Sequence, residues 1–200
     1  MKSTLLVSAG ILVFSLFTSC IPGGSRKEAP AEKIVAGRVQ GTVYTNSYFG
    51  ITVHSPEGWE IQDQAPLKKT NPFQVDLFQS FEYPLDSGYI DNGNIYLTAE
   101  RRNHNPLMDD GGDYLQELKD GLEMLAVETD RFSAISATTV GGKEFYKFET
   151  YSIDTDNDVE TFQEFYATPI KDYWLLIALT YCDEGQKAQL KETLEGIKLK

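Results

Sequence analysis

Alternating apolar and polar residues predict that most of this chain forms β-strands. Several stretches have the period of two that a half-buried strand requires. Turn pairs separate neighbouring stretches, among them Asn92-Gly93 and Gly141-Gly142, whose residues accept positive φ. The predicted strand regions are residues 39–54, with two strands around a turn at Asn46-Ser47, and residues 74–83, 94–101, 133–140, 143–153 and 159–168.

One further strand is apolar at both of its alternating phases. Residues 173–181 read YWLLIALTY and contain no charged side chain. A strand of this composition is covered on both sides, because either face left in water would expose large apolar groups. We therefore expect residues 173–181 to lie in the interior of a sheet that has other elements packed on each face.

Two segments instead have the helical period. Residues 113–127 place leucines on one side and charges on the other, although Gly121 lies within them. Residues 184–195 follow Asp183, a residue type that caps helices, and precede Gly196, a residue type that ends them. Together the patterns predict an α+β domain, an antiparallel sheet with helices on both faces or with helix and loops on each face. The leucines of the first helix are Leu115, Leu118, Leu122 and Leu125.

The apolar run at the start of the chain predicts export. Residues 5–17 are almost wholly apolar and follow Lys2, but they are too few to cross a bilayer, which takes about 20 residues. The run ends in residues 17–20, FTSC, which resemble the lipobox of bacterial lipoproteins, with Phe17 where leucine is usual. The resemblance implies cleavage before Cys20 and acylation of that cysteine with palmitate-type chains, and two or three such chains anchor a protein stably.

These features divide the chain into three parts. They are a signal peptide over residues 1–19, a flexible tether over residues 20–38 that is rich in Gly, Pro and charge, and a single domain over residues 39–200. The alternative for Cys20 is a disulfide with Cys182, or a cysteine that only closes a cleaved signal. Cys182 is not predicted to be a nucleophile, because the acidic residues that follow it disfavour a thiolate.

Net charge narrows the classes of partner. The sequence has 18 basic and 30 acidic residues, and removing Lys2 with the signal leaves 17 basic residues and a net charge of −13. So acidic a body repels the phosphates of nucleic acids and of anionic lipids. We therefore exclude nucleic acid binding and attribute membrane attachment to the lipid anchor alone.

The order of several short motifs resembles the PsbP-like fold. The motifs are VYTNSYFGITVHSPEGW, VGGKEFYKFETY, QEFYATPIKDYWLLIALTY and a final helix that ends in LEGIKL, and together they extend over nearly all of residues 39–200. The same fold occurs in a Ran-binding nuclear import factor and in many small bacterial lipoproteins. The resemblance implies an α-β-α sandwich that serves binding rather than catalysis. Its motifs are structural, so no functional residue is carried over.

The sequence contains no catalytic motif. It lacks a nucleophile elbow, a phosphate-binding glycine loop and a dinucleotide fingerprint, so we expect neither an enzyme nor a cofactor. Asp154, Asp156 and Asp158 alternate like the first ligands of a calcium loop, with Glu160 as a further candidate. Val159 stands where such a loop needs glycine, so we favour a solvated hairpin tip, with weak calcium binding as the alternative.

Four aromatic residues supply the candidate binding surface. Tyr44, Tyr48, Phe49 and Trp59 lie close together in the sequence. Aromatic side chains ringed by polar groups are frequent hot spots of protein interfaces. The alternative interpretation is core packing, because these residues fall at strand phases and turns.

We therefore predict a lipid-anchored, non-enzymatic binding module on the extracytoplasmic side of the cell membrane or the outer membrane, engaging a protein of the cell envelope. One alternative is a carboxylate-dependent hydrolase that uses scattered residues such as Asp76, Glu82 and Glu100. Another is a carbohydrate-binding domain that stacks sugars on the aromatic rings.

Lipidation of Cys20 can be tested by metabolic labelling. We expect a palmitate analogue to label the wild-type protein and not the Cys20→Ala variant, because the cysteine is the predicted acyl acceptor. The variant should also leave the membrane fraction. Equal labelling of the two proteins would contradict the lipoprotein prediction.

Overall fold

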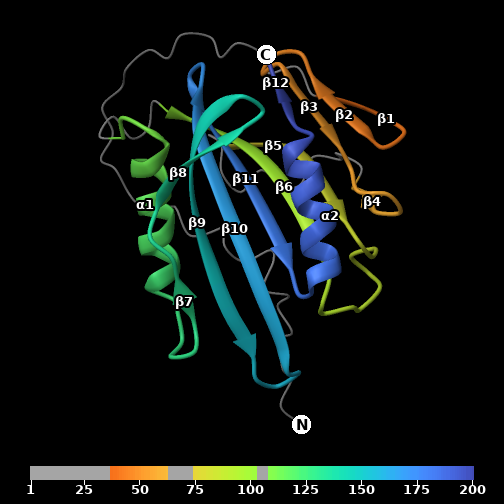
Figure 1. The fold of residues 1–200 in the computed structure, drawn as a ribbon, viewed down its shortest axis with the longest axis vertical. Coiled ribbons are helices and arrows are strands. Elements are labelled where there is room, and N and C mark those ends of the chain that lie inside the picture. Colours follow the sequence, from red (N-terminus) through yellow and green to blue (C-terminus); the bar gives the residue numbers. More distant parts are fainter. Residues whose placement is uncertain (1–36, 63–73, 103–107) are drawn as a thin grey trace, which may run out of the picture.

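The computed structural model describes residues 37–62, 74–102 and 108–200, which form two antiparallel sheets and two helices (Figure 1). The larger sheet has the strand order β4-β5-β6-β11-β10-β9-β7, and β8 pairs with another part of β9. The predicted α+β class and the antiparallel sheet are confirmed. The strands of the larger sheet are β4 (Glu60–Ile61), β5 (Gln74–Phe81), β6 (Asn94–Arg101), β7 (Arg131–Phe132), β8 (Ser136–Val140), β9 (Lys143–Asp154), β10 (Val159–Ile170) and β11 (Tyr173–Tyr181).

The smaller sheet brings the two ends of the described chain together. Its order is β1-β2-β3-β12, and Leu199 of β12 pairs with Ile51 of β3. The last strand therefore closes the domain against its first hairpin, and Figure 1 shows this sheet on the same side as α2. The strands are β1 (Arg38–Gln40), β2 (Val43–Asn46), β3 (Ile51–His54) and β12 (Lys198–Leu199).

Strand β11 lies inside the larger sheet between β6 and β10, and all of its residues are buried, as predicted for residues 173–181. Successive side chains of a strand point to opposite faces, so its residues divide between two core clusters. The first cluster includes Leu175, Ile177 and Leu179 with Leu190 and Leu194 of α2 (Glu184–Glu195). The second includes Trp174, Leu176 and Ala178 with Tyr114, Leu115 and Leu118 of α1 (Gly111–Glu123).

The long strands lie where the alternation predicted them, and the shortest ones were missed. The region 39–54 contains three strands instead of the predicted two, and β4, β7 and β12 were not predicted. Strands of two or three residues are too short to show a period. Each of them forms because a neighbouring strand offers backbone groups to pair with: β5 for β4, β9 for β7 and β3 for β12.

Helix α1 starts and ends earlier than the predicted 113–127. The Asp110 carboxylate caps it by accepting hydrogen bonds from the Gly112 and Asp113 backbone amides at 2.7 and 3.1 Å. The helix ends at Glu123, and the Val127 amide then donates to the Asp130 carboxylate at 2.8 Å in a turn that leads into β7. Leu125, predicted for the apolar face, is therefore 59% exposed.

Helix α2 matches the predicted residues 184–195. The predicted cap is present, because the Asp183 carboxylate accepts a hydrogen bond from the Gln186 amide at 2.8 Å. Within the part of the chain that the structure describes, no helix is long and apolar enough to cross a membrane. Cys20 and the predicted signal peptide lie outside the described residues, and Arg38, predicted as the last tether residue, begins β1.

Amide hydrogen exchange can test the placement of β11. We expect the slowest exchange across residues 175–179, because β11 is paired with β6 on one side and β10 on the other and lies between the two clusters. The three exposed residues of β1 should exchange much faster in the same experiment. Fast exchange across residues 175–179 would contradict the central position of this strand.

Candidate functional site

The predicted aromatic surface is wrong for three of its four residues. Tyr44, Phe49 and Trp59 are 0%, 1% and 7% exposed and belong to the first core cluster. Tyr44 and Phe49 take inward strand and turn positions, so the core-packing alternative holds for them. Tyr48 is half-buried, and the ammonium group of Lys171 lies 3.9 Å from the centre of its ring.

The acidic turn between β9 and β10 has the geometry of a hairpin tip. The Asp154 carboxylate accepts hydrogen bonds from the Asp156 and Asn157 backbone amides and from the Asn157 side chain at 2.7 Å. The Asn157 side chain, followed by the Asp156 amide, lowers the pKa of Asp154. Among residues 37–62, 74–102 and 108–200, no three His, Cys, Asp or Glu side chains are grouped so that they could hold a metal ion.

The scattered carboxylates of the hydrolase alternative have separate partners. Asp76 accepts a hydrogen bond from Tyr96, and Glu100 accepts one from the Tyr114 hydroxyl of α1 at 3.0 Å. Glu82 lies at the other end of β5 and accepts from the Gln186 side chain of α2 at 2.6 Å. The sheet thus gives each carboxylate a neighbour on a different element and does not bring the three together.

A buried carboxylate that the sequence did not single out lies beneath α2. Glu164 of β10 is 2% exposed and accepts hydrogen bonds from Lys191 and from two tyrosines, Tyr166 and Tyr181, the last at 3.0 Å. Burial alone would raise the pKa of this carboxyl, but Lys191 and the two hydroxyls outweigh it and hold the pKa below the usual value of 4.5. The group is therefore ionised and fully paired, which favours a structural role.

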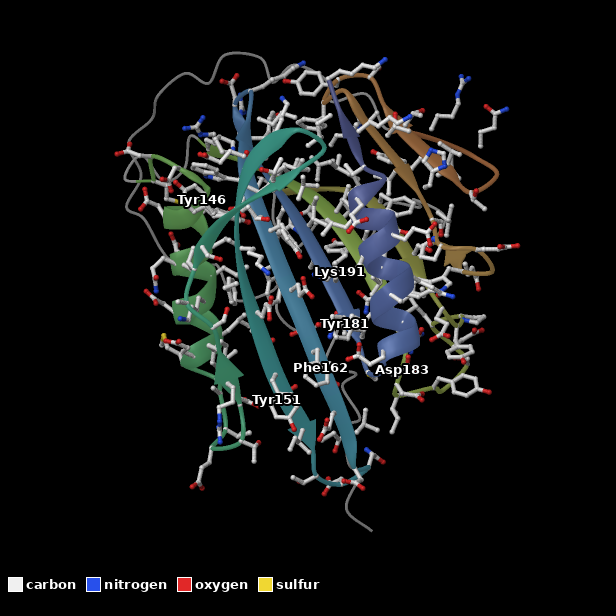
Figure 2. All side chains as sticks on the ribbon, in the orientation of Figure 1. Tyr146, Tyr151, Phe162, Tyr181, Asp183 and Lys191 are labelled. Atoms are coloured by element: carbon white, nitrogen blue, oxygen red, sulfur yellow. The ribbon has the colours of Figure 1, made fainter. Side chains whose placement is uncertain are left out.

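An aromatic row crosses the sheet beside this carboxylate (Figure 2). Tyr151, Phe162 and Tyr181 are register partners on β9, β10 and β11, and Figure 2 shows them following one another across these three strands. The Phe162 and Tyr181 rings are stacked, with centroids 5.5 Å apart and planes 10° apart. Because stacked rings cover one another's faces, this pair does not offer the open platform on which a sugar ring would lie.

The loop between β5 and β6 does expose large apolar side chains. Leu85, Tyr89 and Ile90 are 46%, 58% and 45% exposed, and the Tyr89 ring stacks on Tyr83 with centroids 4.3 Å apart. We call these four residues the β5–β6 loop surface. In Figure 1 the loop lies beside the end of α2 at which that helix begins.

This loop is held in place by several hydrogen bonds. The Asn92 side chain both accepts from the Tyr83 amide and donates to the Tyr83 carbonyl, at 3.0 and 2.8 Å. The Gln186 side chain donates to the Asp91 carbonyl at 2.7 Å as well as to Glu82. Gly93 sits so close to Trp59 and Gln186 that an added Cβ would lie 2.9 Å from the indole. The exposed side chains therefore project from an ordered backbone.

Carboxylates surround the β5–β6 loop surface. Glu82 raises the pKa of the Tyr83 hydroxyl most strongly, and Asp91 and Asp183 add to the shift. The same three carboxylates raise the pKa of the nearby Cys182 thiol, whose burial is the largest cause. Glu82, Asp91 and Asp183 thus lie near both groups at this end of the domain.

Sequence reasoning missed this surface because it treated residues 84–93 only as a connection between strands. The signal was present in YPLDSGYIDNG, residues 83–93, in which three large apolar residues stand among turn residues and acids. Loops are expected to be polar, so apolar residues in a loop indicate either burial or contact with a partner. Only the structure shows that these residues are exposed.

The comparisons with known proteins concern the fold. No protein-family profile matches the sequence, and no curated protein matches it significantly. CyanoP, the PsbP of the cyanobacterium Synechocystis sp. PCC 6803, is similar over 86% of this chain and 98% of its own, with 13% identity and a TM-score of 0.52. The chain therefore has the PsbP-like fold, as its motifs implied, and at this identity the likeness concerns the fold alone.

Two other solved structures are more distant. LpqN of Mycobacterium tuberculosis, which is involved in cell envelope biogenesis, matches over 74% of this chain and 82% of its own, with 14% identity and a TM-score of 0.46. The Ran-binding protein Mog1p of Saccharomyces cerevisiae matches over 75% and 90%, with 12% identity and a TM-score of 0.44.

The role of Glu164 predicts a measurable loss of stability. At neutral pH we expect Glu164→Gln to lower the free energy of unfolding by about 2 kcal/mol, because it weakens hydrogen bonds to a buried charge. The matched control is Glu149→Gln on β9, whose carboxylate is 48% exposed and pairs with Lys147 at 2.8 Å. It should change stability by less than about 0.5 kcal/mol.

The same pair of variants gives a pH test. The folded-state pKa of Glu164 is lowered, so its contribution is complete above the unfolded value of 4.5 and is lost as the pH falls through the folded value. Urea unfolding should therefore show the gap between wild type and Glu164→Gln narrowing below about pH 4.5. A gap that stayed constant, or a Glu149→Gln loss of equal size, would remove the assigned role.

Proposed function

We propose that this protein is a lipid-anchored binding module of the bacterial cell envelope, an extracytoplasmic PsbP-like α-β-α sandwich that engages a protein partner through the β5–β6 loop surface. The lipobox-like residues 17–20 support the anchor, and the tether of residues 20–38 gives the domain reach. The proposed partner site is not the aromatic surface predicted from the sequence, which is largely buried. It is the neighbouring β5–β6 loop, whose residue Gly93 lies against the Trp59 indole.

The single observation that carries the proposal is the exposure of large apolar side chains on an ordered loop. Removing apolar surface from water is favourable by about 25 cal/mol per Å². The exposed side chains of Leu85, Tyr89 and Ile90 therefore offer a partner free energy of binding that the domain itself does not use. The hydrogen bonds of Asn92 and Gln186 fix the two ends of the loop, at Tyr83 and at Asp91. A preorganised surface loses little conformational entropy when a partner binds.

The other functions have less support from the geometry. A hydrolase would need two carboxylates in one site, whereas Glu82 and Glu100 accept hydrogen bonds from different helices, Gln186 of α2 and Tyr114 of α1. A carbohydrate-binding domain would stack sugars on open ring faces, and the stacking of Tyr83 on Tyr89 already covers one face of each ring. We therefore favour a protein partner.

Site-specific crosslinking in the native host tests the proposal. With benzoylphenylalanine in place of Tyr89, we expect ultraviolet light to give a discrete crosslinked species that mass spectrometry identifies as an envelope protein. The aromatic replacement keeps the character of the site. The same photoreactive residue in place of Asp156, exposed on the β9–β10 turn, is the control.

The outcomes of this experiment are distinct. A species that is enriched at position 89 and absent at position 156 supports the β5–β6 loop surface as the partner site. Crosslinks to lipid, or an identical background at the two positions, would refute it.

A further inference from the structure

We propose that the β5–β6 loop surface binds a protein segment in which Lys or Arg side chains alternate with apolar ones. The inference rests on the proposed function, because it specifies the chemistry of the partner at that surface. It follows from the combination of two features in one place: exposed apolar groups at the centre and carboxylates around them.

The apolar centre sets the first requirement on the ligand. Leu85, Tyr89 and Ile90 are each roughly half exposed, and the Tyr89 ring stacks on Tyr83. Such side chains bind other apolar side chains by removing their common surface from water. A purely polar or purely charged ligand would leave this area exposed.

The carboxylates set the second requirement. Asp86 and Asp91 are exposed on the loop itself, and Asp183 and Glu82 lie close enough to influence the Tyr83 hydroxyl. Lys187 is the first basic residue of α2. Its ammonium group forms an ion pair with Glu184 at 3.0 Å and lies over the Tyr181 ring. The rim is therefore negative, and a cationic group on the partner is complementary to it.

These two requirements distinguish a protein segment from a membrane. An anionic bilayer also receives apolar loop side chains, but its headgroups repel the carboxylates that surround them. The exposed apolar residues Met124, Leu125 and Val127 after α1 lack aromatic groups and provide a comparison site of equal or greater exposure. The negative charge of the carboxylates around the loop thus favours a cationic, partly apolar protein segment.

A defined probe can test this chemistry without knowledge of the partner. The probe is a short synthetic peptide that alternates Lys with Leu and Phe, and its control has Glu in place of every Lys. The protein is the mature chain, residues 20–200, with Cys20→Ala and uniform ¹⁵N labelling. We expect the Lys peptide to shift the amide resonances of residues 82–93 and the Glu peptide to leave them unchanged.

Matched variants separate the two contributions. The combination of Asp86→Asn and Asp91→Asn should weaken binding of the Lys peptide about five- to tenfold, because two carboxylates are lost from the rim. The combination of Asp156→Asn and Asp158→Asn removes the same charge from the β9–β10 turn and should leave binding unchanged. Leu85→Ser with Ile90→Ser should also weaken it, whereas Met124→Ser with Leu125→Ser should not.

The results also separate this inference from the proposed function. If crosslinking at position 89 captures an envelope protein but its yield is insensitive to Asp86→Asn and Asp91→Asn, the partner is a protein and the cationic chemistry is wrong. If the Glu peptide binds as well as the Lys peptide, the inference also fails. Binding of the unlipidated chain to phosphatidylglycerol vesicles, lost with Leu85→Ser and Ile90→Ser, would replace the protein segment by a membrane.

Discussion

The structure depends on one constraint: β11 is apolar on both faces and must be covered on both. All nine of its residues are buried. Its neighbours β6 and β10 satisfy its backbone groups, while α1 and α2 each contribute leucines to one of the two clusters that its side chains enter. The rest of the domain is arranged around these contacts, because exposing either face of β11 would place several large apolar side chains in water.

Helix α2 connects this core to the proposed site. Its leucines pack in the first cluster, its Lys191 pairs with the buried Glu164, and its Gln186 bonds to the loop between β5 and β6. The loop backbone is therefore fixed by an element that is itself fixed by the core. This arrangement allows apolar side chains to project into solvent without the loop collapsing onto the domain.

The buried charge and the exposed apolar groups have opposite physical roles. Glu164 is removed from water, and its donors compensate the desolvation, so it contributes to the position of α2 over the sheet. Leu85, Tyr89 and Ile90 remain in water beside the exposed carboxylates of Asp86 and Asp91, so that part of the surface retains the capacity to bind. The hydrogen bonds of Glu164 are all made within the chain, whereas the exposed loop side chains can be covered only by another molecule.

The sequence by itself determined the elements whose pattern is local. The long strands, the doubly apolar strand, helix α2 with its Asp183 cap and the α+β class all follow from residues close together in the chain. Tertiary structure alone decided which aromatic residues are buried, because Tyr44 is 0% and Tyr89 58% exposed although both are tyrosines. It also decided the shortest strands and the pairing of Glu164 with Lys191, since each depends on a partner that is distant in sequence.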